Sequence, residues 1–184
     1  LLDANEIVMR SVEHKINPKA IIEEYTTLKG EVSVGEGTRI KSGAYIEGPV
    51  YIGKNCVVGP NCYLRPHTVL MDGCKVGNAV EIKNSIIQPE TCIGHLSYLG
   101  DCIIGEKCNF GAGTKVANLR FDDGEVSLEV KQNLVKSGRR KFGCLMGDNV
   151  KTGINVSIMP GRSIYPNAVV EAATTVRNTI YTEQ

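Results

Sequence analysis

Residues 16–82 read INPKAIIEEYTTLKGEVSVGEGTRIKSGAYIEGPVYIGKNCVVGPNCYLRPHTVLMDGCKVGNAVEI, and every sixth residue of this segment is aliphatic. A period of six fits neither an amphipathic helix, which repeats about every 3.6 residues, nor a simple strand, which repeats every two. It is typical of hexapeptide repeats, in which each hexad supplies one short strand and three hexads make one coil of a parallel β-helix. The aliphatic positions are Ile16, Ile22, Leu28, Val34, Ile40, Ile46, Ile52, Val58, Leu64, Leu70, Val76 and Ile82.

The repeat continues almost to the end of the chain, with two slips and one break. The frame loses one residue between Ile82 and Ile87 and another before Ile104, losses that a corner can absorb. It breaks over residues 119–142 and returns at Met146. We therefore expect an all-β, left-handed parallel β-helix of about 23 hexads, or about seven to eight coils, with residues 119–142 extruded as a loop.

Two segments lie outside the repeat. Residues 1–15, LLDANEIVMRSVEHK, carry Leu1, Val8 and Val12 at helical spacing, which predicts a linker helix from an N-terminal domain that this chain lacks. This helix could cover an open end of the β-helix, where strand edges would otherwise be exposed. The excursion contains a predicted hairpin, EVSLEVKQNLVKSG. A single β-helix domain is thus expected over residues 16–184.

Composition limits the compartment and the partners. A net charge of +1 over 184 residues gives no reason to expect nucleic acid or an anionic membrane as a partner, and no segment approaches the ~18 apolar residues of a membrane span. The seven cysteines include no C-x-x-C pair, so reduced, buried thiols in a cytoplasmic protein are expected. Cys56, Cys74 and Cys92 follow one another at intervals of three hexads, one full coil, and are predicted to stack.

Polar residues that interrupt the repeat are the candidates for a functional site. His95 interrupts CIGHLSYLGD, with Tyr98 three residues later. A lone histidine at a corner is usually a solvated surface residue, but histidine is also the usual general base near neutral pH. Glu81, about one coil upstream, could hydrogen-bond a ring nitrogen and fix the tautomer, as an acid partner does in a catalytic pair.

Arg65 and Lys83 are separated by three hexads and should lie one above the other on adjacent coils. They could be two independent surface charges. Held side by side they would form a clamp for a phosphate group. The well-defined register favours the clamp.

Asn109 and Asn118 flank NFGAGTKVAN. Each could be a corner residue that tolerates left-handed backbone, or a hydrogen-bonding group for a sugar or acyl ligand. The three histidines, His14, His67 and His95, lack the spacing of zinc ligands, so no metal site is predicted.

The segment RPHTVLMDGCKVGNAVEIKNSIIQPETCIGHLSYLGDCIIGEKCNFGAGTKVAN resembles the acetyltransferase domain of bifunctional N-acetylglucosamine-1-phosphate uridyltransferase/glucosamine-1-phosphate acetyltransferase. RP, GN-VE-K, GHLSYLGD and N-GAGT occur in the same order and nearly the same spacing, and the resemblance covers most of residues 16–176. The segments SGRRKFG, ANLRFDDG and LLDAN are similar to archaeal members that join a sugar-phosphate nucleotidyltransferase to the acetyltransferase.

The resemblance implies a role for each candidate. His95 would take a proton from the substrate amine, supported by Glu81. The phosphate would be held by Arg65 and Lys83. Tyr98 and Asn109 would contact the sugar, and Asn118 and Lys141 would complete the site. The backbone amide near Ala112 would face the thioester oxygen, and Ala172 would lie along the coenzyme A path.

The implied function is transfer of an acetyl group from acetyl-CoA to glucosamine 1-phosphate; whether galactosamine 1-phosphate is also accepted is left open by the sequence. A homotrimer with sites between prisms is expected. The chain departs from the bacterial pattern: Asn118 precedes a longer insertion, Ile154 stands where a serine is used in the coenzyme site, and the arginine-bearing C-terminal tail is absent. The competing hypothesis is a non-catalytic β-helix that trimerises and regulates an attached nucleotidyltransferase.

Overall fold

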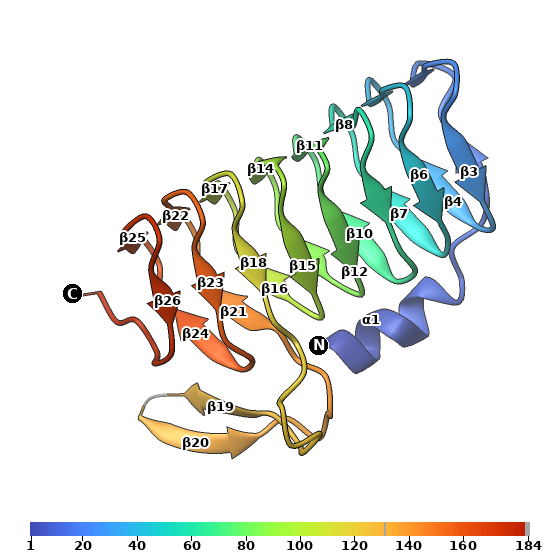
Figure 1. The fold of residues 1–184 in the computed structure, drawn as a ribbon. Helices are drawn as coiled ribbons and strands as arrows, with labels where there is room; N and C mark the ends of the chain where they lie inside the picture. The colour runs from blue at the N-terminus through green and yellow to red at the C-terminus, as the bar shows by residue number, and fades with distance from the viewer. Residues whose placement is uncertain (131, 183–184) are drawn as a thin grey trace.

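The computed structural model describes residues 1–130 and 132–182 and shows a prism with three walls (Figure 1). Within the described residues each wall is a parallel sheet of eight strands, and successive strands of the chain belong to successive walls. Three strands therefore make one coil, and eight strands per wall give eight coils. The predicted left-handed parallel β-helix is confirmed.

The three walls are called sheets A, B and C. Sheet A contains β1 (Lys15–Ile16), β4 (Val32–Val34), β7 (Val50–Ile52), β10 (Thr68–Leu70), β13 (Ile86–Ile87), β16 (Ile103–Ile104), β21 (Cys144–Met146) and β24 (Arg162–Ile164). Sheet B contains β2 (Ile21–Ile22), β5 (Arg39–Ile40), β8 (Val57–Val58), β11 (Lys75–Asn78), β14 (Cys92–His95), β17 (Asn109–Phe110), β22 (Lys151–Thr152) and β25 (Val169–Val170). Sheet C contains β3 (Thr27–Lys29), β6 (Tyr45–Glu47), β9 (Tyr63–Leu64), β12 (Glu81–Lys83), β15 (Tyr98–Gly100), β18 (Lys115–Val116), β23 (Ser157–Ile158) and β26 (Thr175–Val176).

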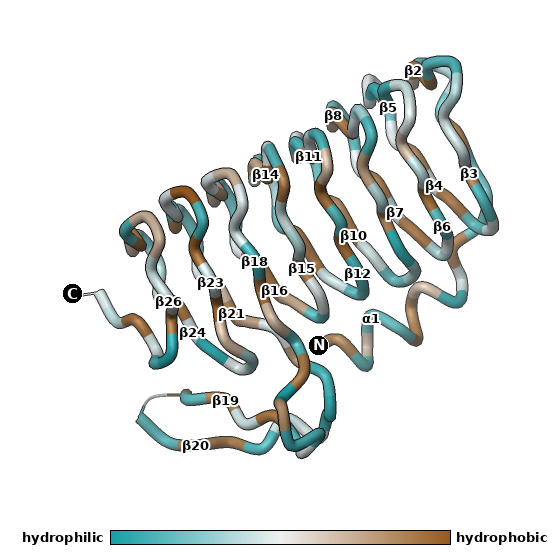
Figure 2. The backbone as a smooth tube through the Cα atoms, viewed as in Figure 1, coloured by the Kyte–Doolittle hydropathy of each residue, from teal (hydrophilic) through white to brown (hydrophobic). Residues whose placement is uncertain are grey.

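The aliphatic residue of each hexad points into the prism. Ile40, Ile46 and Ile52, one from each wall of a coil, are fully buried. Hydrophobic residues recur at the same place on one coil after another (Figure 2). Burying one such side chain stabilises a fold by roughly 1.5–3 kcal/mol. Because the coils after the first repeat this burial, the outward-facing residues are free to carry a site.

The two slips shorten two consecutive coils. Val50 of β7 pairs with Thr68 of β10, a separation of three complete hexads, whereas Val69 of β10 pairs with Ile86 of β13, where the separation is shorter by one position. Ile86 then pairs with Ile103 of β16 across the same shortened separation. The aliphatic residues stay inside because the missing residue is taken from a corner. The same shortening explains why one thiol, Cys92, does not lie where its spacing predicted.

The seven cysteines are free thiols, and all except the partly buried Cys92 are buried, as expected. Burial raises the pKa of Cys62 and of Cys74 to about 12. These two thiols are therefore protonated near neutral pH and behave as small apolar residues.

The predicted stack of Cys56, Cys74 and Cys92 is wrong at its third member. In the shortened coil Lys75 pairs with Cys92, so Cys92 faces outward and Thr91 takes the buried corner position. The Thr91 hydroxyl accepts a hydrogen bond from the backbone N–H of Cys108, at 3.0 Å, and so continues the stack.

Helix α1 (Leu2–Met9) is shorter than the predicted helix over residues 1–15 and lies along the side of the prism (Figure 1). Leu1 and Val8, whose spacing suggested the helix, are 82% and 63% exposed, whereas Leu2 and Met9 are buried. Leu2 and Met9 are two turns apart and share one face of the helix. Among the described residues no helix combines the length and apolar character needed to cross a membrane.

The helix does not cap an end of the prism, which corrects the suggestion made from the sequence. Its Leu2 packs in a cluster with residues of the excursion, over the outer face of sheet A; the cluster contains Leu2, Val126, Leu128 and Phe142, with Ile86, Ile103 and Leu145 beneath. Ile21 and Ile22 in the N-terminal coil remain 50% and 36% exposed. Apolar side chains on the outside of sheet A thus determine where α1 docks.

The excursion leaves the prism after β18 and returns at β21. Its predicted hairpin is confirmed as antiparallel strands β19 (Ser127–Val130) and β20 (Asn133–Lys136). An antiparallel bridge between Leu119 and Lys141 closes its base. The excursion therefore brings its basic end, Arg139 to Lys141, back beside the prism and α1.

Candidate active site

Arg65 and Lys83 lie side by side on the outer face of sheet C. Tyr63 pairs with Glu81 between β9 and β12, and the Arg65 N–H donates to the Ile82 carbonyl at 2.9 Å. The residue after β9 therefore neighbours Lys83 on the next coil. The geometry is the one expected from their separation by three hexads.

The Arg65 guanidinium is paired with a carboxylate in this structure. Its Nη1 lies 2.8 Å from Glu81 Oε1, and this hydrogen bond raises the pKa of Arg65. The guanidinium also lies over the Tyr63 ring, 5.7 Å from its centroid. Both side chains of the ion pair are more than a third exposed, at 35% and 38%, so the pair is weak.

Lys83 is held by a residue that the sequence reasoning missed, Asp101. Lys83 Nζ lies 3.2 Å from Asp101 Oδ2, and the Asp101 side chain is only 2% exposed. Two carboxamides also donate to Asp101, from Asn84 at 2.8 Å and from Asn118 at 2.5 Å. A buried carboxylate is tolerated only when it is paired and hydrogen-bonded. Its signal in the sequence was its place at the end of GHLSYLGD, directly after Gly100, which pairs with Lys83 across the shortened coil.

The side chains of Tyr98 and Asn118 lie close together over Gly100, which belongs to the same strand as Tyr98, β15. The Asn118 carboxamide lies 3.5 Å from the Tyr98 hydroxyl. A Cβ on Gly100 would lie 2.5 Å from that hydroxyl and 2.6 Å from Asn118 Nδ2, so only glycine leaves room for this contact. Burial, together with the charges of Glu81 and Asp101, raises the pKa of Tyr98, and its hydroxyl can donate to a ligand.

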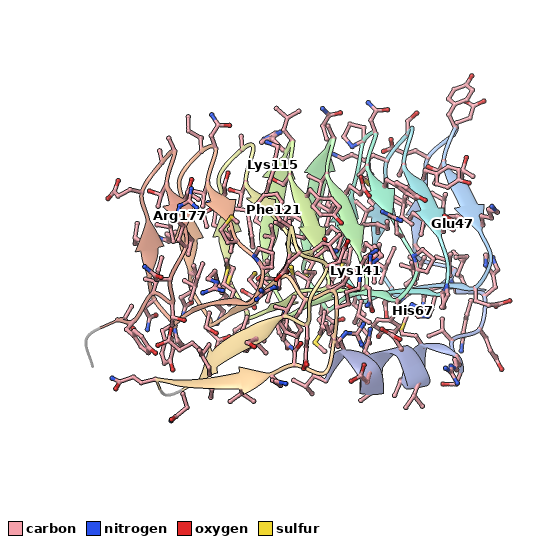
Figure 3. The ribbon with its side chains drawn as sticks, turned by 60° about the horizontal axis from the view of Figure 1, so that its bottom comes forward. Glu47, His67, Lys115, Phe121, Lys141 and Arg177 are labelled. Carbon is pink, nitrogen blue, oxygen red and sulfur yellow. The ribbon has the colours of Figure 1, made fainter. Side chains whose placement is uncertain are left out.

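An open pocket of about 560 Å³ joins Arg65 and Lys83 to the excursion and to α1. Lys141 and His67, labelled in Figure 3, line it from the excursion and from the corner after β9. Its basic or titratable nitrogen groups are Arg65, His67, Lys83, Arg139, Arg140 and Lys141, and its carboxylates are Asp3, Glu6 and Asp101. The surplus of cations suits an anionic ligand.

His95, Ala112 and Ala172 line the corner between sheets B and C. The Gly113 N–H donates to the His95 carbonyl at 3.2 Å, which places Ala112 on the coil next to His95. Ile154 and Ala172 follow on the next two coils, and Ile154 is 56% exposed. Ala112 is partly exposed and Ile154 and Ala172 are exposed, so the three residues form an outward-facing column parallel to the axis of the prism.

The predicted contact between His95 and Glu81 is not among the hydrogen bonds of the described residues. His95 ends β14 in sheet B, where it pairs with Asn78, whereas Glu81 begins β12 in sheet C and its carboxylate accepts from Arg65. Support of His95 by Glu81 therefore stays a prediction.

Asn109 lies apart from the clamp in this chain. It is exposed on sheet B, where it pairs with Cys92 and Lys151, whereas Arg65 and Lys83 are on sheet C. Asn109 thus lies on one side of the corner between sheets B and C. The other side of this corner carries Arg65, Lys83, Tyr98, Asn118 and Lys141.

Residues 46–180, more than half of the chain, match the family described as the GMPPB C-terminal domain. The chain belongs to this family. It is also similar to curated archaeal proteins. The bifunctional sugar-1-phosphate nucleotidylyltransferase/acetyltransferase of Sulfurisphaera tokodaii is 53% identical over 155 residues, which cover 81% of this chain and 39% of that protein. The bifunctional protein GlmU of Methanococcus aeolicus is 49% identical over 180 residues, which cover 98% of this chain and 43% of that protein.

The chain therefore spans about two fifths of the length of these relatives. A solved structure, a putative acetyltransferase of Bacillus cereus, superposes with a TM-score of 0.57 at 17% identity and covers 82% of this chain and 76% of its own. That likeness shows the fold alone. Together these findings make the chain a hexapeptide-repeat domain related to acetyltransferase domains, as its sequence suggested.

Proposed function

We propose that this domain transfers an acetyl group from acetyl-CoA to the amino group of glucosamine 1-phosphate. The observation that carries the proposal is the pair of cations, Arg65 and Lys83, in one pocket that also receives Lys141. Charge-assisted hydrogen bonds from such a group suit a phosphate monoester. The name of the Sulfurisphaera tokodaii relative, which includes sugar-1-phosphate and acetyltransferase, supports the same chemistry.

In this proposal the phosphate takes the place of the Glu81 carboxylate on Arg65. Lys83, kept in position by Asp101, supplies the second charge and Lys141 the third. The Tyr98 hydroxyl and the Asn118 carboxamide then face the sugar ring. With the phosphate held, the amino group of the sugar can be directed toward the corner that carries His95.

The proposed chemical step is attack of the sugar nitrogen on the thioester carbonyl. His95 accepts the proton that the nitrogen loses as the N–C bond forms. The C–S bond breaks, and the sulfur leaves as a thiolate that takes up a proton to give free coenzyme A. The Ala112 amide is proposed to face the carbonyl oxygen, where a hydrogen-bond donor stabilises developing negative charge.

Acetyl-CoA is proposed to lie along the corner between sheets B and C. Ala112 and Ala172 have short side chains there, and Ile154 between them is exposed. The pantetheine arm is extended, so a path along the prism axis can bring its thioester to the coil that carries His95.

Thiol release is the direct test of the proposed function. With acetyl-CoA and glucosamine 1-phosphate together, we expect release of free coenzyme A, followed with a thiol reagent, and N-acetylglucosamine 1-phosphate as the second product. A parallel reaction with galactosamine 1-phosphate measures substrate preference. Because the cysteines are mostly buried, the protein contributes little background. Absence of turnover with both amino sugars would favour the non-catalytic alternative, a β-helix that serves assembly.

We further propose that the chain forms a homotrimer with sites between prisms. The argument is the separation of Asn109 on sheet B from Arg65 and Lys83 on sheet C, since a second prism at the corner can supply the missing side chain. Sedimentation equilibrium is expected to give three times the chain mass of 19.9 kDa. A monomer at micromolar concentration would contradict a shared site.

A further inference from the structure

The basic end of the excursion is tied to α1 by Arg139, whose side chain is only 18% exposed. Its Nη1 contacts Asp3, and its Nη2 donates to Glu6 Oε1 at 2.6 Å. Asp3 and Glu6 are three residues apart, so both face the same side of the helix. The hydrogen bond from Arg139 holds the pKa of Glu6 below its ordinary value, which keeps this carboxylate charged.

The same residues reach the carboxylate that holds Lys83. Arg139 Nη2 lies 3.9 Å from Asp101 Oδ1. The Asn84 carboxamide bridges the two acids, donating to Glu6 Oε1 at 3.0 Å and to Asp101 Oδ1 at 2.8 Å. Among the described residues, Lys83 and Arg139 are the cations within 4.0 Å of Asp101.

Asp101 therefore interacts with two cations of different function. Because it is nearly inaccessible to water, its charge must be balanced by groups of the protein. When Arg139 supplies part of that balance, Lys83 is less tightly held and can turn toward a phosphate. Without Arg139, Lys83 would be the remaining cation on Asp101, and the pocket would also lose one positive charge.

We propose that Arg139 is a positioning residue through which helix α1 sets the phosphate affinity of the pocket. The carboxylates of α1 hold Arg139 at the rim, where it shares Asp101 with Lys83. A change in the docking of α1 would therefore change how strongly the sugar phosphate binds. This inference rests on the proposed function, because it takes the pocket to be the phosphate site.

The proposal predicts opposite effects from two substitutions in one network. Arg139→Met leaves Lys83 to neutralise Asp101 alone and should weaken phosphate binding. Glu6→Gln keeps the shape and the acceptor oxygen of the side chain but removes its charge. Arg139 is then held less firmly by α1 and moves toward Asp101 and the pocket, so phosphate binding should tighten. A purely structural network would weaken binding in both variants.

Isothermal titration of glucosamine 1-phosphate into the full chain tests this. We expect Arg139→Met to weaken binding about tenfold and Glu6→Gln to strengthen it about threefold, as expected for residues that couple to a site through a network. Arg139→Lys keeps the charge but loses the forked geometry that reaches Asp3, Glu6 and Asp101 together, so its affinity should fall between those of the unchanged protein and Arg139→Met. Arg10→Met and Glu13→Gln are the matched controls, because both residues are exposed and outside the network. These should leave the affinity unchanged.

The possible outcomes separate the two proposals. If the unchanged protein binds the sugar phosphate but both Arg139→Met and Glu6→Gln weaken binding, or neither alters it, the role of Arg139 is refuted and the proposed function stands. If the unchanged protein does not bind glucosamine 1-phosphate, the proposed function fails and this inference fails with it. Should Arg139→Met not fold, the sign of the Glu6→Gln effect decides alone, because that substitution is isosteric.

Discussion

His95→Ala is expected to lower the turnover number for acetyl transfer by about two to four orders of magnitude, the usual contribution of a general base. The amino group of the sugar must lose a proton as it attacks the thioester, and the variant has no group positioned to accept it. Binding two substrates side by side still contributes through proximity, so some activity remains. Steady-state kinetics with acetyl-CoA and glucosamine 1-phosphate measure the loss.

The fold should not change in this variant, because His95 is an exposed residue at the end of β14. The thermal midpoint, the oligomeric state and the affinity for acetyl-CoA are expected to match those of the unchanged protein. His14→Ala is a matched control, since His14 is also exposed and lies before the first coil. Turnover at the original rate in His95→Ala, with glucosamine and galactosamine 1-phosphate alike, would show that the base is elsewhere.

Arg65→Ala and Lys83→Ala should each weaken binding of the amino-sugar phosphate by about tenfold to a hundredfold, since a charge-assisted hydrogen bond contributes roughly 1.5–3 kcal/mol. Acetyl-CoA binding should change much less, because its proposed path is the corner between sheets B and C. Separate titrations of the two ligands measure this difference.

The two variants should differ in stability, because their carboxylate partners differ in burial. Arg65→Ala leaves Glu81, which is 38% exposed and can be solvated, whereas Lys83→Ala leaves Asp101 at 2% exposure with one cation fewer. A lower thermal midpoint is therefore expected for Lys83→Ala than for Arg65→Ala. Lys29→Ala is the control, because Lys29 is an exposed lysine paired with Glu47 on the same sheet. If Arg65→Ala or Lys83→Ala weakened the binding of the amino-sugar phosphate and of acetyl-CoA equally, this would indicate damage to the fold and contradict the clamp.

The coil geometry could be predicted from the sequence because it depends on a local repeat. An aliphatic residue every six positions specifies which side chains enter the prism, and the same count of three hexads places Arg65 beside Lys83. The hairpin within the excursion was also predictable, since two short strands and a turn lie within one segment. These features need no knowledge of distant contacts.

The misplaced thiol shows where this reasoning stops. The spacing of three hexads continues from Cys74 to Cys92, yet the shortened coil pairs Lys75 with Cys92 and places Thr91 inside. The aliphatic Ile93 must remain buried, and its burial decides the register of the strand. The regular spacing of its small neighbour, Cys92, does not. The position of a missing residue must therefore be found from the buried aliphatic residues before the corner residues can be assigned to buried or outward positions.

The surroundings of the clamp depend on contacts between distant parts of the chain. Arg139 is 136 residues from Asp3 and 133 from Glu6, and Asn84 is 78 residues from Glu6, so no repeat or motif indicated that they meet. The meeting depends on where α1 docks, which is determined by an apolar patch on the outside of sheet A. The six-residue repeat thus specifies the prism and which residues stack on its outer faces, because the buried positions recur at a fixed period. The charges around Arg65 and Lys83 depend on packing between nonrepeating segments, which only the tertiary structure decides.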